Sequence, residues 1–286
     1  MDRPPCPQWR HVEVTCINDT QMKGYPVTIL KCPQHHMQIA IMGRIERMQR
    51  WICFAQSQAI SRTIIESYLG SCGDQWVKIQ VYVDPAIARR VTDVPIPFTH
   101  FPTGSLHLYP RTGIGHEMTH FVSYHTFRGR PQWSFLEEGL AEYFSDPFVR
   151  GHHQAIQAAR EDGAVEDLVR GATQWIRSDN SDGEGQCLRG SFVGYLLETL
   201  GAETFGQLWR RGDAFETALP AVCGWPLTQM LERWVEQLSS DQINLTREPG
   251  PLLRDRTVME AFEPCLACRE VAMQRPWENA VSENKS

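Results

Sequence analysis

The sequence predicts an α+β protein, because segments with the pattern of strands precede residue 110 and segments with the pattern of helices follow it. Residues 76–85 alternate apolar and polar side chains, which is typical of a strand with one buried face. Residues 133–146 instead place their apolar side chains at helical spacing. At 286 residues the chain is expected to form one globular unit with two lobes.

The first part of the chain is expected to supply the sheet. Residues 11–17 and 27–32 are predicted strands joined by a polar turn. Residues 37–69 have apolar positions at helical spacing and are predicted to form one long or broken helix. After the strand at 76–85, the Pro-rich segment 85–103 is expected to be a loop, and residues 105–109 are a short candidate strand.

The second part is expected to be helical. A helix is predicted at 113–121, directly after the candidate strand, followed by the helix at 133–146. A further helix at 152–175, a polar loop at 180–186 and helical segments from 187 to 239 complete the prediction.

This pattern divides the chain into three expected regions. Residues 1–75 would form the N-terminal strands and long helix, residues 76–239 the central core, and residues 240–286 an extension. The last residues, 275–286, are polar and expected to be frayed.

Composition narrows the classes of partner. The net charge is -6, and the Lys and Arg residues are scattered, which argues against a nucleic-acid partner. Hydrophobic residues make up 42% and charged residues 22%, as in ordinary globular proteins. No run of 18 apolar residues occurs, so no membrane span is expected.

The compartment is left open between two alternatives. The N-terminus lacks the apolar region of a secretory signal, which favours the cytoplasm. Nine cysteines and three glycosylation sequons, at Asn18, Asn244 and Asn284, are compatible with secretion. The pair Cys265 and Cys268 lacks a second such pair, so a local disulfide or two free thiols is favoured over a structural zinc site.

The segment GIGHEMTHF, residues 113–121, contains the main chemical signal. On a helix, His116 and His120 lie one turn apart on the same face and can present their imidazoles to one metal ion. Glu117 is rotated by about 100° and can reach a metal-bound water instead of the metal. The pattern H-E-x-x-H therefore predicts a zinc site with a general base.

A catalytic zinc needs a third protein ligand and an open position. A third histidine six residues after the second is excluded, because that position is Thr126, and His125 lies one residue away from it. Glu138 is the better candidate, because the chain can turn back after the first helix and pack the second helix beside it.

The neighbouring carboxylates are assigned separate roles. Glu142 lies one helical turn after Glu138, where it could accept the second N–H of a ligand histidine and fix its tautomer. Glu137 is turned away by about 100° and is expected to be solvated.

These residues resemble the gluzincin metallopeptidases, the thermolysin and M1 aminopeptidase side of the zincins. His116-Glu117-x-x-His120 is followed by LEEGLAEY at 136–143, which resembles that family's L-N-E-G-F-A-x-Y helix, with Phe135 where M1 enzymes usually have Trp. The interval to the third ligand is one residue shorter than in M1 enzymes, which indicates a smaller peptidase MA-like relative. The resemblance covers about residues 76–239 and implies a zincin-like fold.

The resemblance implies a zinc metallopeptidase with one catalytic Zn²⁺ bound by His116, His120 and Glu138. Glu117 would take the proton of the attacking water and pass it to the leaving amine of a peptide or protein substrate. Tyr195 is a candidate oxyanion stabiliser, although a core aromatic at that helical position is the commoner case. The strand at 105–109 is expected to be the edge strand that pairs with an extended substrate.

Two other readings stay open. No G-x-M-E-N segment, the M1 aminopeptidase's handle for a free α-amino group, occurs upstream of the motif, which argues against an aminopeptidase of the M1 type and leaves endopeptidase and exopeptidase action both open. A catalytically inactive zincin-fold binding or regulatory protein is the second class, although the intact Glu117 argues against it. In the third, the motif is accidental and the chain is a helical interaction domain.

Overall fold

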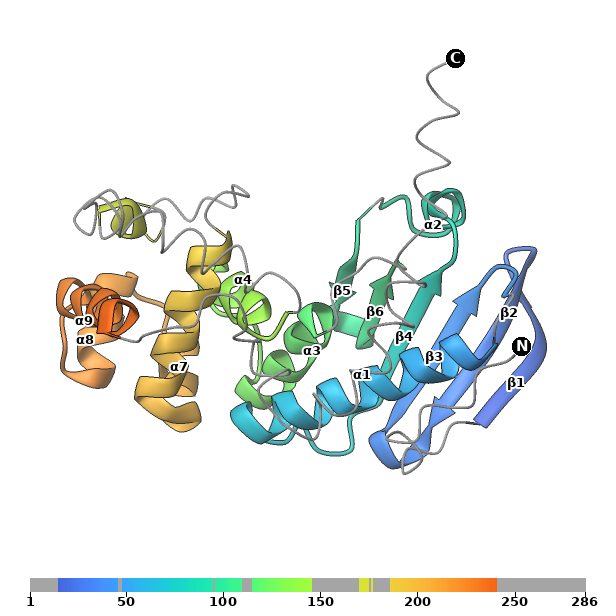
Figure 1. Ribbon diagram of the computed structural model, residues 1–286, viewed down its shortest axis with the longest axis horizontal. Coiled ribbons are helices and arrows are strands. Elements are labelled where there is room, and N and C mark those ends of the chain that lie inside the picture. Colours follow the sequence, from blue (N-terminus) through green and yellow to red (C-terminus); the bar gives the residue numbers. More distant parts are fainter. Residues whose placement is uncertain are drawn as a thin grey trace, which may run out of the picture. The chain divides into compact units, whose positions relative to one another are not determined.

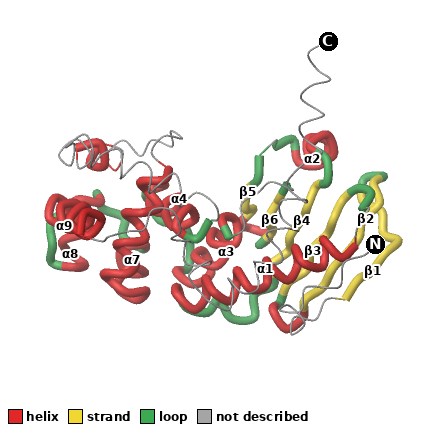
Figure 2. The backbone as a smooth tube through the Cα atoms, in the orientation of Figure 1, coloured by secondary structure: helices red, strands yellow, loops and turns green. Residues whose placement is uncertain are grey.

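A six-stranded mixed sheet and a series of helices make up the computed structural model, which describes residues 15–45, 48–94, 96–109, 115–145, 170–174, 176 and 186–240. The strand order is β1-β2-β3-β4-β6-β5, and Figure 1 shows the strands in this sequence across the sheet. Every described strand precedes residue 110, and the described part of the chain after it is helical (Figure 2). This arrangement is consistent with the predicted α+β class.

The antiparallel half of the sheet begins with a hairpin. Strand β1 (Thr15–Met22) pairs with β2 (Tyr25–Cys32) across a two-residue turn, in which Lys23 and Gly24 have φ of 48° and 81°. Two consecutive left-handed residues give the turn a twist that matches the strands. The predicted strand pair is therefore present, although β1 extends five residues beyond the predicted end at residue 17.

The predicted helix from residue 37 is wrong over its first turns. Residues Met37–Met42 form strand β3, which follows a short 3-10 helix, η2 (Pro33–His35), and pairs with β2 on one side and β4 on the other. Met37, Ile39 and Ile41 are fully buried, because they alternate along the strand and face one side of the sheet. The helix itself, α1, runs from Met48 to Leu69.

The parallel half of the sheet contains β4 (Val77–Tyr82) and β6 (Ser105–Leu108). The expected edge strand at 105–109 is wrong, because β6 lies between β4 and β5 (Phe98–His100), and β5 is the strand at that edge. Antiparallel pairing joins Thr99 to Leu106, which encloses β6 on both sides.

The segment 85–103 is also more ordered than its proline content predicts. It forms helix α2 (Pro85–Thr92), β5 and the 3-10 helix η3 (Phe101–Thr103). The α2 helix has a strong start signal, in which the carboxylate of Asp84 accepts a hydrogen bond from the backbone N–H of Ala86 at 2.7 Å, and Pro85 follows it. Helix α2 buries Ile87 and Ala88 against Tyr82 and Tyr109.

One buried cation connects α1 to the sheet. Arg62 is 3% exposed, and its Nη1 donates to the carbonyl oxygens of His35 and Gln75 at 2.8 and 3.0 Å. These carbonyls belong to the turn before β3 and the residues before β4. The guanidinium thus satisfies backbone acceptors of two chain connections at one end of the sheet.

Besides the helical residues 170–174, five described helices follow the sheet along the chain. They are α3 (His116–Phe127), α4 (Ser134–Tyr143), α7 (Gln186–Trp209), α8 (Phe215–Cys223) and α9 (Leu227–Ser240). Helix α7 is interrupted at Gly201, whose φ of 72° and ψ of 161° lie outside the helical region, so it is two helical segments in sequence. Trp209 and Trp234 are each 1% exposed and belong to the core.

The described residues cluster into two compact units, one of 15–63 with 74–117 and the other of 64–73 with 118–240. The expected boundaries at residues 75 and 239 stay predictions. Residues 170–174 and 176 are helical, but the rest of the predicted helix at 152–175, most of the loop at 180–186, the Cys265–Cys268 pair and the tail at 275–286 lie outside the described residues. Within the described part of the chain, no helix combines the length and apolarity needed to cross a membrane.

Candidate metal centre

Helix α3 carries three of the predicted site residues in its first turns. The chain enters the helix through Gly115, whose φ of 98° lies in the region that favours glycine. Met118, Phe121 and Val122 are at most 1% exposed and hold the helix in the core. His116 and His120 are four residues apart on one continuous helix, so its geometry brings their imidazoles to the same face.

Helix α4 carries the fourth residue, Glu138. The turn between the helices is held by Trp209, whose indole N–H donates to the carbonyl of Gly129 at 2.8 Å. Helix α4 then packs closely on α7, because a Cβ placed on Gly139 would lie 2.5 Å from Cγ2 of Val193 and 2.9 Å from the carbonyl oxygen of Arg189. The absence of a side chain at Gly139 sets the depth at which its neighbour Glu138 is held.

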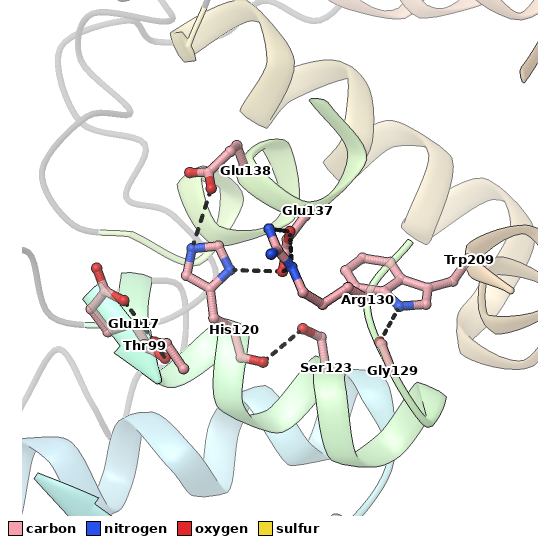
Figure 3. Close-up of polar contacts among 9 residues, drawn as sticks. All are labelled: Thr99, Glu117, His120, Ser123, Gly129, Arg130, Glu137, Glu138 and Trp209. Atoms are coloured by element: carbon pink, nitrogen blue, oxygen red, sulfur yellow. Dashed lines mark hydrogen bonds and ion pairs between the residues drawn. The ribbon is translucent and has the colours of Figure 1, made fainter. Parts of the chain in front are cut away.

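His116, His120 and Glu138 together form a group that can hold a metal ion. Each offers one ligand atom, and these atoms lie within 4.8 Å of one another. Nε2 of His120 lies 3.7 Å from Oε1 of Glu138 (Figure 3), which is too long for a hydrogen bond. Tetrahedral ligands at the usual zinc distances lie roughly 3.3–3.6 Å from one another, so small side-chain adjustments fit this set to the ion.

The expected solvation of Glu137 is wrong. Its side chain is 3% exposed, and it accepts a bidentate pair of hydrogen bonds from Arg130, with Nε 3.0 Å from Oε1 and Nη2 2.6 Å from Oε2. Oε1 of Glu137 lies 3.7 Å from Nδ1 of His120. Figure 3 shows the His120 ring between Glu138 on one side and Glu137 on the other.

Charge compensation explains how Glu137 is tolerated in the core. Burial raises the pKa of Glu137 above its ordinary value, and the hydrogen bond from Arg130 opposes that shift. The same hydrogen bond raises the pKa of Arg130, which keeps the guanidinium charged. Arg130 is 56% exposed, so a solvated cation compensates a buried carboxylate.

Glu117 is buried as well, at 6% exposed, and its carboxylate has a partner that the sequence did not predict. The hydroxyl of Thr99, on β5, lies 2.7 Å from Oε2 of Glu117 and 3.2 Å from its carbonyl oxygen (Figure 3). A carboxylate is therefore held at the position that the motif assigns to a general base.

The two remaining predicted residues keep their roles only as predictions. Glu142 is 8% exposed on α4 and packs against Gly190 of α7. A Cβ placed on Gly190 would lie 3.0 Å from the Cβ of Glu142. Tyr195 is half-buried on α7. The carboxylate of Glu137 accepts a hydrogen bond from Arg130 and lies 3.7 Å from Nδ1 of His120, at the place where support for a ligand histidine was expected from Glu142.

No protein-family model and no curated protein sequence matches the chain. Among solved structures, a mutant M1 zinc metallopeptidase from Deinococcus radiodurans is 13% identical with a TM-score of 0.37, over 84% of this chain and 54% of that one. A second M1 zinc metallopeptidase structure from the same organism is 13% identical with a TM-score of 0.35, over 84% and 53%.

A two-domain M1 zinc metallopeptidase mutant bound to L-tryptophan is 14% identical with a TM-score of 0.33, over 84% and 54%. This chain spans about half the length of these structures.

Proposed function

We propose that this chain is a zinc-dependent metallopeptidase with a zincin-like core, of the gluzincin, peptidase MA-like kind that the motifs resemble. The observation that carries the proposal is the placement of His116, His120 and Glu138, whose ligand atoms lie within 4.8 Å of one another. Two imidazoles and one carboxylate are a donor set that zinc prefers, and three protein ligands leave a position for substrate or water.

The ligand residues are supported by groups that hold them in place. His116 and His120 are fixed by one helix, and Glu138 by the close packing of α4 on α7. The carboxylate of Glu137 would favour the His120 tautomer that carries its proton on Nδ1. Nε2, on the side of Glu138, would then be available to bind the ion. Zinc bound there would supply a Lewis acid that polarises a carbonyl and acidifies a water molecule.

Glu117 would perform the proton transfers. Its carboxylate accepts a proton from the water that attacks the peptide carbonyl and delivers it to the amine nitrogen as the C–N bond breaks. The remaining proton of the water passes from the new carboxyl group to the amine, so the products are a carboxylate and an ammonium group, and Glu117 returns to its starting state. Thr99, which binds this carboxylate, lies on the edge strand β5, so β5 takes the substrate-pairing role once expected of residues 105–109.

The test compares wild type with Glu117→Gln on a mixed peptide library, with the zinc content of each protein measured beside it. Glu117→Gln should retain one equivalent of zinc and lose roughly 10²–10⁴-fold in kcat, because the amide cannot accept the proton. His116→Ala, His120→Ala and Glu138→Ala should lose both zinc and cleavage. Equal cleavage by wild type and Glu117→Gln would contradict the role of Glu117.

Two further outcomes separate the alternative readings. Wild-type protein that binds one equivalent of zinc but cleaves no library peptide would indicate a zincin-fold binding or regulatory protein. Wild-type protein with less than about half an equivalent of zinc at neutral pH would indicate that the motif is accidental.

A further inference from the structure

We propose that Thr99 is a positioning residue that orients the carboxylate of Glu117 for proton transfer, an inference that rests on the proposed function. The two residues come from different elements, because Thr99 lies on strand β5 and Glu117 in the first turn of α3. Eighteen positions separate them in the sequence, and the H-E-x-x-H motif contains no signal for this contact.

The distances identify the carboxylate as the partner of the hydroxyl. Oγ1 of Thr99 lies 2.7 Å from Oε2 of Glu117 and 3.2 Å from the carbonyl oxygen of the same residue. A threonine hydroxyl has one hydrogen to donate, and the shorter, charge-assisted bond to the carboxylate is the stronger of the two. The second carboxylate oxygen points away from Thr99 in Figure 3.

Burial gives this bond its effect. Glu117 is 6% exposed, so water can hold its carboxylate only weakly, and a hydrogen bond from a fixed hydroxyl restricts its rotamers. A hydroxyl can also accept a hydrogen bond, so Thr99 remains a partner while the carboxyl group carries the proton in transit. One orientation of the carboxylate is thereby kept through the reaction, which is the kind of positioning that lowers an activation barrier.

The backbone of Thr99 is held in the sheet independently of its side chain. Its backbone belongs to β5, at the edge of the sheet, and pairs with Leu106 of β6. This backbone pairing holds the strand without the hydroxyl. Removal of the hydroxyl should therefore change the orientation of Glu117 while leaving the sheet intact.

The experiment compares Thr99→Val, which keeps the shape and loses the hydroxyl, with Thr99→Ser, which keeps the hydroxyl. Thr103→Val is a matched control, because the Thr103 hydroxyl bonds to His100 and Ser105 in the same β5–β6 connection. Each purified full-length, zinc-loaded variant is assayed with the mixed peptide library and with a peptide that wild type cleaves, and its zinc content and Tm are measured.

Thr99→Val should lower kcat by roughly 10–100-fold, with KM and zinc content within about twofold of wild type. Thr99→Ser should keep kcat within about threefold, and Thr103→Val should match wild type. Unchanged kcat in Thr99→Val would overturn the proposal, and so would an equal loss in Thr99→Ser. A loss of zinc or a large fall in Tm in Thr99→Val would overturn it in favour of a structural role. Absence of zinc-dependent cleavage by wild type is a different result and would contradict the proposed function itself.

Discussion

At the residue scale, the carboxylate of Glu137 lies beside His120, which is one of the proposed zinc ligands. Glu137 has a buried carboxylate 3.7 Å from Nδ1 of His120, and its charge is compensated by Arg130. A carboxylate near the second nitrogen of a ligand histidine orients the ring and raises its basicity. Glu137 therefore belongs with the residues that support the proposed zinc ligand.

Removal of the Glu137 carboxylate should weaken zinc binding. Glu137→Ala should lower zinc affinity by roughly 10–100-fold, measured by competition with a chelator of known affinity. Glu137→Gln is the matched control, because its amide keeps the side-chain volume and an acceptor oxygen near Nδ1 of His120, so zinc affinity should stay closer to wild type. Zinc affinity in Glu137→Ala equal to that of wild type would show that Glu137 serves only the ion pair with Arg130.

The sequence identified the ligand candidates but not this support, and the reason is geometric. A rotation of 100° per residue places Glu137 on another face of α4 than Glu138. The Glu137 side chain would be solvated only if no other part of the protein packed on that face. Here that face meets His120 and Arg130, which come from α3 and the turn after it. Thr99 was missed for a similar reason, because its partner Glu117 is distant in sequence.

His107 gives a second prediction at this scale, outside the proposed site. It lies on β6 and is 9% exposed, with Nδ1 2.8 Å from the hydroxyl of Tyr82 and Nε2 3.3 Å from that of Ser105. Phe98 stacks on its ring at 4.1 Å. Burial, together with the smaller effect of the nearby His100, lowers the pKa of His107 to about 4.

Because the folded pKa lies below the value of an unfolded histidine, the unfolded chain binds the proton first as the pH falls. The stability that neutral His107 provides is present above pH 6.5 and is lost as the pH falls from 6.5 towards 4. The loss between pH 7 and pH 5 should be about 2 kcal/mol of unfolding free energy. Urea unfolding of wild type and His107→Gln at both pH values measures it, and an equal pH dependence in the two proteins would contradict this assignment.

At the element scale, the sheet shows where short-range patterns are insufficient. Residues 37–42 have apolar side chains that fit both strand alternation and the start of the helical pattern that continues in α1. Parallel pairing with β4, some forty residues later, decides between them, and that contact cannot be read from a local window. Strand β5 was missed because it has three residues and lies in a Pro-rich segment.

The helices near the site were easier to predict, since their apolar faces and flanking turns are local signals. Helices α3 and α4 were expected at 113–121 and 133–146, and they are found at His116–Phe127 and Ser134–Tyr143. What the pattern did not contain is their depth of packing, which Gly139 sets through its approach to Val193 and the carbonyl of Arg189.

Gly139→Ala tests that packing. The added methyl would lie 2.9 Å from a backbone oxygen, so α4 must shift, and the free energy of unfolding should fall by about 1–3 kcal/mol. Gly171→Ala is the matched control, because a Cβ there meets nothing within 4 Å and the residue is helical, so stability should be unchanged or raised by up to about 1 kcal/mol. Urea unfolding of the metal-free proteins measures both, and a Gly139→Ala protein as stable as wild type would contradict the close contact.

At the scale of the whole molecule, the order of elements along the chain was the most predictable property. The hydrophobic period of the sequence changes near residue 110, and this change predicts strands before that residue and helices after it. The strand order β1-β2-β3-β4-β6-β5 did not follow, because it depends on which distant strands pair. The proposed ligands connect two helices of this scaffold, α3 and α4, so metal binding should be linked to global stability.

Zinc should stabilise the folded protein by mass action, because an unfolded chain does not hold His116, His120 and Glu138 together. At a free zinc concentration 100 times Kd, the free energy of unfolding should rise by about 2.7 kcal/mol, and a chelator should reverse the gain. Thermal unfolding of wild type across a zinc series measures this as a rising Tm. His116→Ala and Glu138→Ala should show little or no rise, since each removes one of three ligands.

His125→Ala is the matched control for these variants, because it removes a histidine from the same helix at a position that the spacing excludes as a ligand. His125 packs on Phe121 with ring centroids 4.6 Å apart, so this variant should have a lower Tm without zinc. It should nevertheless retain the full zinc-dependent rise. A zinc response that is lost in His125→Ala and kept in Glu138→Ala would show that the third ligand is His125 of α3 and not Glu138 of α4. Equal responses in all the variants would show that zinc binds elsewhere on the chain.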